Sequence, residues 1–355
     1  MRTTLKLTLI LLTMLSARSM GQETGTDPTA ADGDEPIQRI AIIGASASAG
    51  FGVVVEQAEG VGEPYAKTML KMQDLYMAAD GKADLVYLDL SGHMFFSRPR
   101  SYGRSMVDRL QAWKPDLVFG VDFLFWFVFG VIPEEKRLEF LEVGLGMLDE
   151  LASQGIPMVI GEVPDLEGTE SFVISSRQIP LRSTVIEANK RINEWAADRD
   201  NVAVVPLQVL TEQLSSGGEL VIGPHHWKPE AEGIRMIAAD KLHPTFDGMI
   251  CLAQAVEVAA RSIDSIQRSP GRLPPMQLDR DDLVVRMRVR RLKPRIKTRS
   301  NRATAQYLSR RPRSRFWSVS VVAISSAALT DSRAPRSPLR RMMCGIKRLR
   351  SGAIR

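Results

Sequence analysis

The chain contains few residues of the kinds that bind metals or form disulfides. Its 355 residues include two cysteines, Cys251 and Cys344, and four histidines. Two cysteines cannot build the disulfide framework on which many small exported proteins depend. The adjacent His225 and His226 have no cysteine and no second spaced histidine pair to complete a ligand set. We therefore expect a fold with an ordinary hydrophobic core and no metal centre.

The amino-terminal segment lacks the length of a membrane span. Its apolar run at residues 7–15 is too short, but a basic start precedes this run and small residues follow it up to Gly21. This pattern predicts a secretory signal peptide over residues 1–21, and therefore export to the periplasm or the cell exterior. An uncleaved membrane anchor is the alternative.

Basic residues are concentrated at the other end of the chain. From Arg268 onward there are 24 lysines and arginines against four aspartates, although the net charge of the whole chain is only +6. We predict an acidic linker over residues 22–37, one domain over 38–267 and a basic tail over 268–355. The tail has three interpretations: a disordered appendage, translation past a frameshift, or an electrostatic contact with a polyanion. Export argues against nucleic acid as a specific partner.

Apolar, β-branched runs alternate with helical segments across the predicted domain. This alternation predicts an α/β fold of three layers, with a five-stranded parallel sheet between two layers of helices. Residues 207–229 depart from the pattern and are interpreted as an insertion or lid near a site. The expected strands are 40–43, 85–90, 117–122, 157–161 and 202–206, and the expected helices are 65–79, 105–113, 133–153, 181–198 and 248–266.

Two stretches about two hundred residues apart carry the residue types of a nucleophilic serine site. Ser46 follows the first predicted strand in a turn of small residues, where a parallel sheet exposes side chains at its carboxyl edge. Asp240 lies three residues before His243, so its carboxylate can reach Nδ1 while Nε2 stays free. A serine becomes nucleophilic when an imidazole takes its proton and a carboxylate orients the imidazole. The pattern therefore predicts Ser46 as nucleophile, with Ser48 as its rival.

These stretches resemble sequence blocks of the SGNH, or GDSL, hydrolase superfamily. Residues 44–52, Gly-Ala-Ser-Ala-Ser-Ala-Gly-Phe-Gly, are similar to its Gly-Asp-Ser block, with Ala45 where aspartate is usual. Residues 240–244, Asp-Lys-Leu-His-Pro, match its Asp-x-x-His block without a gap. The resemblance implies a flavodoxin-like fold and a serine esterase with Ser46, Asp240 and His243 as catalytic residues. It also implies small-molecule, carbohydrate or lipid esters as substrates.

The same turn is not a dinucleotide-binding loop. Ser46 interrupts the Gly-x-Gly-x-x-Gly spacing that such a loop requires. A covalent serine mechanism needs no organic cofactor, so we expect none.

The middle blocks of the family match less closely. Gly92 follows the second predicted strand and is similar in position to the family's oxyanion glycine, so the implied oxyanion donors are the amides of Gly92 and Ser46. Asp122 stands where the family's Gly-x-Asn-Asp block has asparagine. An ionised Asp122 would repel an oxyanion, whereas a protonated Asp122 could donate to it. The sequence leaves both possibilities open.

An aromatic run follows Asp122 and has two interpretations. Residues 123–129 read Phe-Leu-Phe-Trp-Phe-Val-Phe, which is typical of a buried core segment and also of an apolar substrate wall. We take Phe123, Phe125 and Trp126 as candidate substrate-binding residues. The sequence as a whole predicts an exported serine esterase. Because Ala45 and Asp122 replace two family residues, a catalytically inactive protein of this fold that binds a lipid or a glycan is the second hypothesis.

Overall fold

The computed structural model describes residues 35–55, 68–80, 85–171, 173–283 and residue 286. The predicted signal peptide, the linker up to residue 34 and the basic tail from residue 287 lie outside this range. Export and the three interpretations of the tail therefore remain predictions. Within the described range, no helix combines the length and the apolar composition that crossing a membrane requires.

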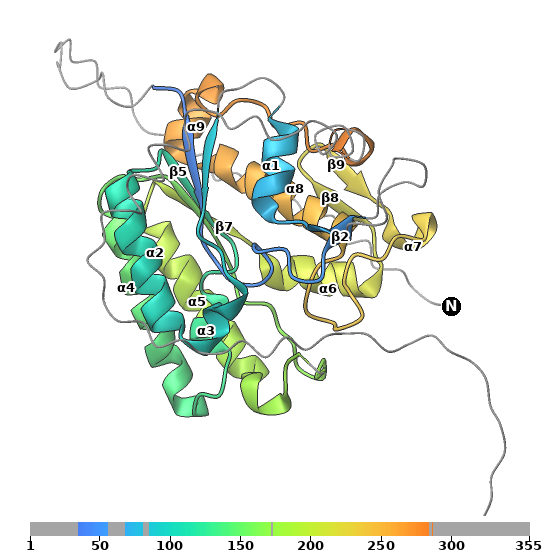
Figure 1. Ribbon diagram of the computed structural model, residues 1–355. Coiled ribbons are helices and arrows are strands. Elements are labelled where there is room, and N and C mark those ends of the chain that lie inside the picture. Colours follow the sequence, from blue (N-terminus) through green and yellow to red (C-terminus); the bar gives the residue numbers. More distant parts are fainter. Residues whose placement is uncertain (1–34, 56–67, 81–84, 172, 284–285, 287–355) are drawn as a thin grey trace, which may run out of the picture. The chain divides into compact units, whose positions relative to one another are not determined.

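A five-stranded parallel sheet lies at the centre of the domain (Figure 1). Its order, β4-β1-β5-β6-β7, is the flavodoxin-like order, and it confirms the α/β class predicted from the sequence. In this order the chain changes direction across the sheet between β1 and β5, and ligands of open α/β sheets bind at such a point. The strands are β1 (Arg39–Ile42), β4 (Val86–Asp89), β5 (Leu117–Gly120), β6 (Met158–Gly161) and β7 (Val202–Val205).

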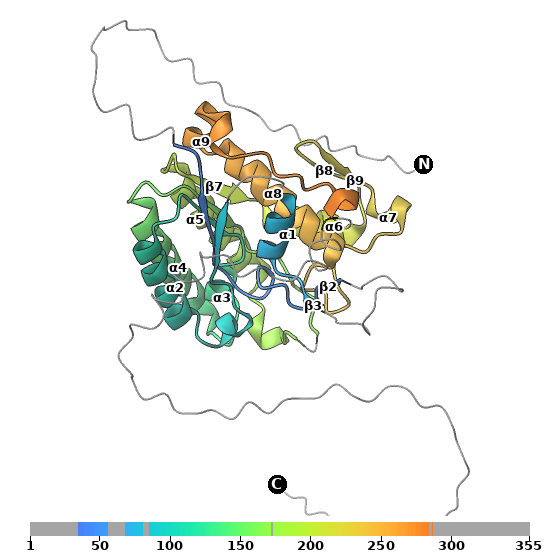
Figure 2. The ribbon, with the colours of Figure 1, turned by 45° about the horizontal axis from the view of Figure 1, so that its top comes forward.

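Helices cover both faces of the sheet. Along the first strand, Ile40 and Ile42 join one buried core, whereas Ala41 and Ile43 join the other, as the two-residue period of a strand requires. Figure 2 shows α1 beside α8 on the first face, and α2, α4 and α5 pack on the second face. The helices are α1 (Met72–Ala79), α2 (Pro99–Trp113), α4 (Arg137–Ala152), α5 (Arg182–Ala197) and α8 (Phe246–Ser262).

Three predicted helices have clearly different bounds in the structure. The helix expected at 105–113 begins six residues earlier, because α2 starts at Pro99. The helix expected at 65–79 begins only at Met72, because the short strand β3 (Thr68–Met69) comes before it and pairs with β2 (Val54–Val55). The helix expected at 248–266 is interrupted at Ile263, whose extended backbone separates α8 from α9 (Asp264–Arg268). The remaining short helices are η1 (His93–Ser97), α3 (Phe125–Val128), η2 (Glu134–Lys136), η3 (Ser176–Gln178), α7 (Pro229–Glu232) and η4 (Pro270–Arg272).

The stretch 207–229 forms elements of its own. It begins with α6 (Leu207–Ser216) and continues into a hairpin of β8 (Leu220–Ile222) and β9 (His225–Trp227). Its buried residues Leu210, Leu220 and Trp227 belong to the same core as α1 and α8. The stretch is therefore part of the packed domain.

The packed chain also continues beyond the predicted boundary at residue 267. Leu273, Met276, Leu278 and Leu283 are buried in the first core. The side chain of Gln254 on α8 donates a hydrogen bond to the Leu278 carbonyl at 2.7 Å. Residues 269–283 thus cover α8, although their high polar content resembled the start of a tail.

Candidate functional site

Ser46 lies in a tight turn at the carboxyl end of β1. The turn begins at Gly44, which has a φ of +145°, and is closed by backbone hydrogen bonds from Ala49 to Ala45 and from Phe51 to Ser46. Small side chains allow the chain to turn sharply here without steric conflict. The Ser46 side chain is thereby presented at the edge of the sheet beside the end of β5.

Asp240 and His243 are held together in a compact loop before α8. One carboxylate oxygen of Asp240 accepts hydrogen bonds from the amides of Leu242 and His243, both at 3.0 Å. The other oxygen lies 2.8 Å from His243 Nδ1. Lys241 takes a left-handed conformation, with a φ of 60°, that allows so tight a loop. Both Asp240 and His243 are buried, so the imidazole has a defined orientation.

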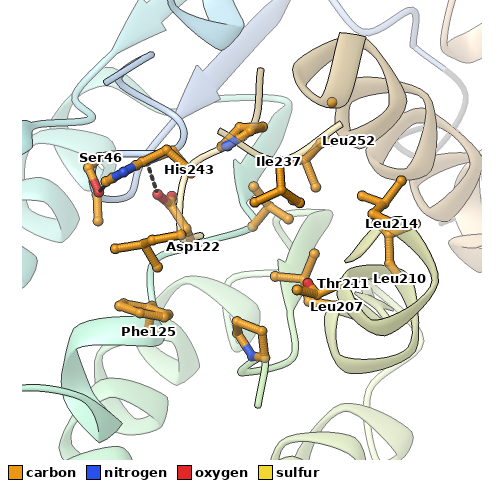
Figure 3. A pocket seen from close by; sticks show the side chains of 17 residues that line it. Ser46, Asp122, Phe125, Leu207, Leu210, Thr211, Leu214, Ile237, His243 and Leu252 are labelled. Atoms are coloured by element: carbon orange, nitrogen blue, oxygen red, sulfur yellow. Dashed lines mark hydrogen bonds between the residues drawn. The ribbon is translucent and has the colours of Figure 1, made fainter. Parts of the chain in front are cut away.

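The fold brings this loop to the turn after β1. His243 Nε2 lies 2.8 Å from Ser46 Oγ, although the two residues are separated by 197 positions in the chain. Figure 3 shows Ser46 and His243 facing each other at one end of a pocket. The three side chains predicted from the two sequence stretches therefore form one continuous hydrogen-bonded series.

The surroundings of Asp240 favour its ionised form. Burial of this carboxyl works to raise its pKa, but hydrogen bonds from the His243 amide, the His243 ring and the Leu242 amide outweigh burial and hold the pKa below its ordinary value. An ionised Asp240 stabilises a proton on the facing Nδ1. Nε2 is then left to accept the proton of the Ser46 hydroxyl.

Asp122 lies at the end of β5, but its contacts differ from those of an oxyanion donor. Its Oδ2 accepts the amides of Ala47 at 2.9 Å and Ser48 at 3.1 Å, and its Oδ1 accepts the Ser48 hydroxyl at 2.6 Å. Burial raises the pKa of Asp122, while these hydrogen bonds oppose the rise. Both oxygens accept hydrogen bonds from the turn that carries Ser46, so the observed contacts of Asp122 differ from those of the donor that was one of its two predicted roles.

Gly92 also has different contacts from those expected. Its amide donates to the Gly44 carbonyl at 3.1 Å, which ties the loop after β4 to the start of the Ser46 turn. An amide that is already donating in this way is not directed at a substrate oxygen. The expectation for Gly92 is corrected accordingly, and the Ser46 amide is the sequence-predicted donor that remains.

The aromatic run divides between core and pocket. Phe125 lines the pocket beside Ser46 (Figure 3), whereas Phe123 and Trp126 are absent from its lining. Phe123 is fully buried against Phe95 and Phe127 in the second core, and the Trp126 ring packs on Phe96 and Phe125. Of the three substrate-binding candidates, the structure brings only Phe125 to the site.

Two further features complete the site. The first was not predicted from the sequence, and the second lies in the stretch 207–229 that was interpreted as an insertion or lid near a site. The Phe51 ring lies 4.6 Å from the His243 ring, between centroids, and so covers the imidazole. Helix α6 supplies one wall of the pocket through Leu207, Leu210, Thr211 and Leu214 (Figure 3). The apolar spacing within 207–214 indicates a helix with one buried face, but only the tertiary structure shows what that face contacts.

Comparisons with known proteins find similarity in structure rather than in sequence. No family model matches the chain, and no curated protein matches its sequence. LAE5, an alpha/beta hydrolase enzyme from the metagenome of Lake Arreo in Spain, is 16% identical, with 65% of this chain and 98% of that chain covered at a TM-score of 0.39. The acetylxylan esterase Axe2 from Geobacillus stearothermophilus is 15% identical, with 64% and 96% covered at 0.41. A protein from Parabacteroides merdae named as a GDSL-like lipase is 12% identical, with 65% and 97% covered at 0.39.

Proposed function

We propose that the protein is an ester hydrolase in which Ser46 is the nucleophile, His243 the general base and Asp240 the group that orients the imidazole. The observation that carries this proposal is the series of hydrogen bonds joining the three side chains. Both the Ser46 Oγ to Nε2 distance and the Nδ1 to Asp240 distance are 2.8 Å. This is the arrangement that activates a serine hydroxyl for acyl transfer.

In the first step, Ser46 Oγ attacks the carbonyl carbon of the ester while His243 Nε2 takes the hydroxyl proton. The carbonyl oxygen becomes an oxyanion, and the Ser46 amide is placed in the turn to donate to it. The bond between the carbonyl carbon and the alcohol oxygen then breaks, and His243 returns the proton to the departing alcohol. An acyl ester on Ser46 remains.

In the second step, water attacks the acyl ester. His243 takes a proton from the water and delivers it to Ser46 Oγ as the acyl bond breaks, so the carboxylic acid leaves and the serine is restored. Asp240 stays ionised throughout and stabilises the imidazolium that forms in each step. Carboxylic esters of small molecules, carbohydrates or lipids all fit this chemistry.

A second function, binding without catalysis, is favoured by the contacts of two residues. The Gly92 amide and both Asp122 oxygens are occupied within the protein, which leaves the Ser46 amide as the sequence-predicted oxyanion donor. Loss of one oxyanion donor costs about a hundred- to a thousandfold in rate. A protein with this fold and no turnover would bind a lipid or a glycan in the pocket beside Ser46.

A fluorophosphonate probe distinguishes the two functions. We expect the full chain to be labelled, Ser46→Ala to lose all labelling, and Ser48→Ala to keep it because the Ser48 hydroxyl donates to Asp122. Asp240→Asn should lower hydrolysis of a p-nitrophenyl ester by about ten-thousandfold, because it stabilises the wrong imidazole tautomer. A folded protein that neither reacts with the probe nor hydrolyses the ester would support the binding function instead.

We also propose that the domain acts after export. The basic start, short apolar run and small residues of segment 1–21 support this. Sequencing the mature protein from its native host should give an amino terminus at Gln22. A mature chain that still begins at Met1 would instead support the uncleaved anchor.

A further inference from the structure

A mostly apolar pocket begins at Ser46 and His243 and ends against α6 (Figure 3). Its volume is about 90 Å³. The wall opposite Ser46 consists of Leu207, Leu210 and Leu214 from α6, and Leu252 from α8 completes it. The polar side chains in the lining are Ser46, Asp122, Thr211 and His243.

The chemistry of the lining selects an apolar occupant. The Asp122 oxygens are engaged by the turn, and the Ser46 and His243 side chains hydrogen-bond each other. Thr211 is therefore the polar side chain left to meet a ligand deep in the pocket. A sugar placed here would lose its water without gaining partners for its hydroxyls, which costs several kcal/mol per group. A hydrocarbon chain meets no such penalty.

The order of the two chemical steps assigns this pocket to the acyl group. The alcohol must leave before water can attack, so the alcohol needs an open exit. The acyl group becomes bonded to Ser46 Oγ in the first step and leaves only at the end of the second, so it can occupy a recess. A recess that starts at Ser46 and is closed by α6 suits the group that leaves last.

The volume limits the length of the chain. An apolar cavity of about 150 Å³ holds one benzene ring, or six carbon atoms. In proportion, a pocket of about 90 Å³ accommodates roughly four carbons. An acetyl group would leave this pocket partly empty, and an octanoyl chain would exceed it.

Leu214 and Ile237 are shared between this pocket and a neighbouring cavity. Both residues also line a second cavity, of about 440 Å³, whose other lining residues lie between positions 215 and 241. The two side chains thus form a partition between the first pocket and a larger space. Removing part of this partition would let a longer chain pass through.

We propose that α6 forms the acyl pocket of the enzyme and selects short apolar acyl chains of about four carbons, with Leu214 as the residue that limits their length. This inference rests on the proposed hydrolase function. It goes further by naming the acyl class and the element that selects it.

The test measures kcat/KM for p-nitrophenyl acetate, butyrate and octanoate, so that only the acyl group varies. We expect the wild-type chain to prefer butyrate. Thr211→Trp should fill the pocket and lower the ratio of butyrate to acetate activity at least tenfold. The matched control is Val209→Trp, which adds the same bulk on the exposed face of α6, where Val209 is 41% exposed, and should leave the ratio unchanged.

Leu214→Ala tests the partition separately. It should raise the ratio of octanoate to butyrate activity at least tenfold, and Ile237→Ala should act in the same direction. Because Leu214 packs against the first core, fluorophosphonate labelling of each variant serves as the check that its site is intact. Leu214→Ala and Ile237→Ala each remove an apolar side chain from the partition. If both variants raise the octanoate ratio, the opened partition is the cause, because a local loss of packing would differ between the two positions.

The outcomes separate this inference from the proposed function. If wild type and variants react with the probe but all show the same chain-length profile, the acyl pocket is overturned and the hydrolase remains. If Thr211→Trp instead changes the preference among leaving alcohols at constant acyl group, the pocket holds the alcohol and the inference is equally overturned. If the folded wild-type chain neither reacts with the probe nor hydrolyses any of the esters, the proposed function fails and the acyl pocket fails with it.

Discussion

The carboxylate of Asp122 accepts the hydroxyl of Ser48 at 2.6 Å, two positions after the proposed nucleophile in the same turn. It also accepts the amides of Ala47 and Ser48. One side chain from the end of β5 thereby holds the turn that follows β1. In the family that the sequence resembles, asparagine is usual where Asp122 stands, whereas here the aspartate acts as an acceptor for the turn.

Replacing Asp122 should therefore change the position of Ser46. Asp122→Ala leaves two amides and one hydroxyl without their acceptor in a buried place, at about 1–3 kcal/mol for each unmade hydrogen bond. We expect kcat/KM for p-nitrophenyl butyrate to fall about a hundredfold, as for a displacement of the nucleophile by about 1 Å. Asp122→Asn keeps an oxygen acceptor and should lose less than tenfold. Equal losses in the two variants would contradict a positioning role.

Ionisation of Asp122 should lower the free energy of unfolding. Burial raises the pKa of Asp122 above its ordinary value, so the folded state favours the protonated carboxyl more than the unfolded state does. The contribution of this group to the free energy of unfolding is therefore fully present below about pH 4 and is lost as the pH rises through the raised pKa. Asp122→Asn does not titrate. In urea unfolding we expect the wild-type chain to lose free energy of unfolding relative to Asp122→Asn between pH 4 and pH 7. A relative gain over that interval would show that the hydrogen bonds outweigh burial.

Gly44 should tolerate no side chain. It has a φ of +145°, and an added Cβ would lie 2.0 Å from Asp122 Oδ1 and 3.0 Å from Ser48 Oγ. Gly44→Ala must therefore separate Asp122 from the turn, and we expect at least a tenfold loss of fluorophosphonate labelling rate. Gly52→Ala is the matched control, because Gly52 also has a positive φ, of +74°, but no atom within 4 Å of an added Cβ. If both variants label equally slowly, backbone strain and not the contact with Asp122 is the cause.

Arg137 should stabilise the segment that carries Phe125. It is 2% exposed, its Nε donates to Glu134 at 2.5 Å and its Nη1 donates to the Val128 carbonyl at 2.6 Å. Arg137→Ala removes a buried guanidinium and leaves the α3 carbonyl without this donor, whereas Glu134 is about a third exposed and keeps its hydrogen bonds from Leu181 and Thr184. We therefore expect a loss of about 1–3 kcal/mol in urea unfolding, mainly from the carbonyl left without its donor. Lys136→Ala breaks an exposed ion pair with Glu139 and should leave stability unchanged within error. A loss of similar size in both variants would argue against a special role for the buried Arg137 guanidinium.

The strands and most helices could be predicted because their signals are local. A strand buried on both faces is a short apolar run such as 117–122, and the five runs of this kind all belong to the sheet. The ends of helices and of the domain were less predictable where contacts with distant segments determine them. The prediction extends a helix over 65–71, but within the described residues Thr68 and Met69 pair with the strand at Val54–Val55. The boundary at 267 failed to include Leu273 and Met276 because isolated apolar residues in a polar stretch give no periodic signal.

Within the site, the sequence alone determined the contacts that lie within a few residues of each other. His243 lies three positions after Asp240, so a compact loop is enough to join them, and the small residues around Ser46 are enough to form a turn. The tertiary structure decided every relationship that spans the chain: Ser46 with His243 across 197 positions, Asp122 with the turn across 74, and α6 with the pocket. It also decided that Gly92 and Asp122 serve the turn. The residue type determines which hydrogen bonds a side chain can donate or accept, but only the packed fold determines which partner lies close enough to form them.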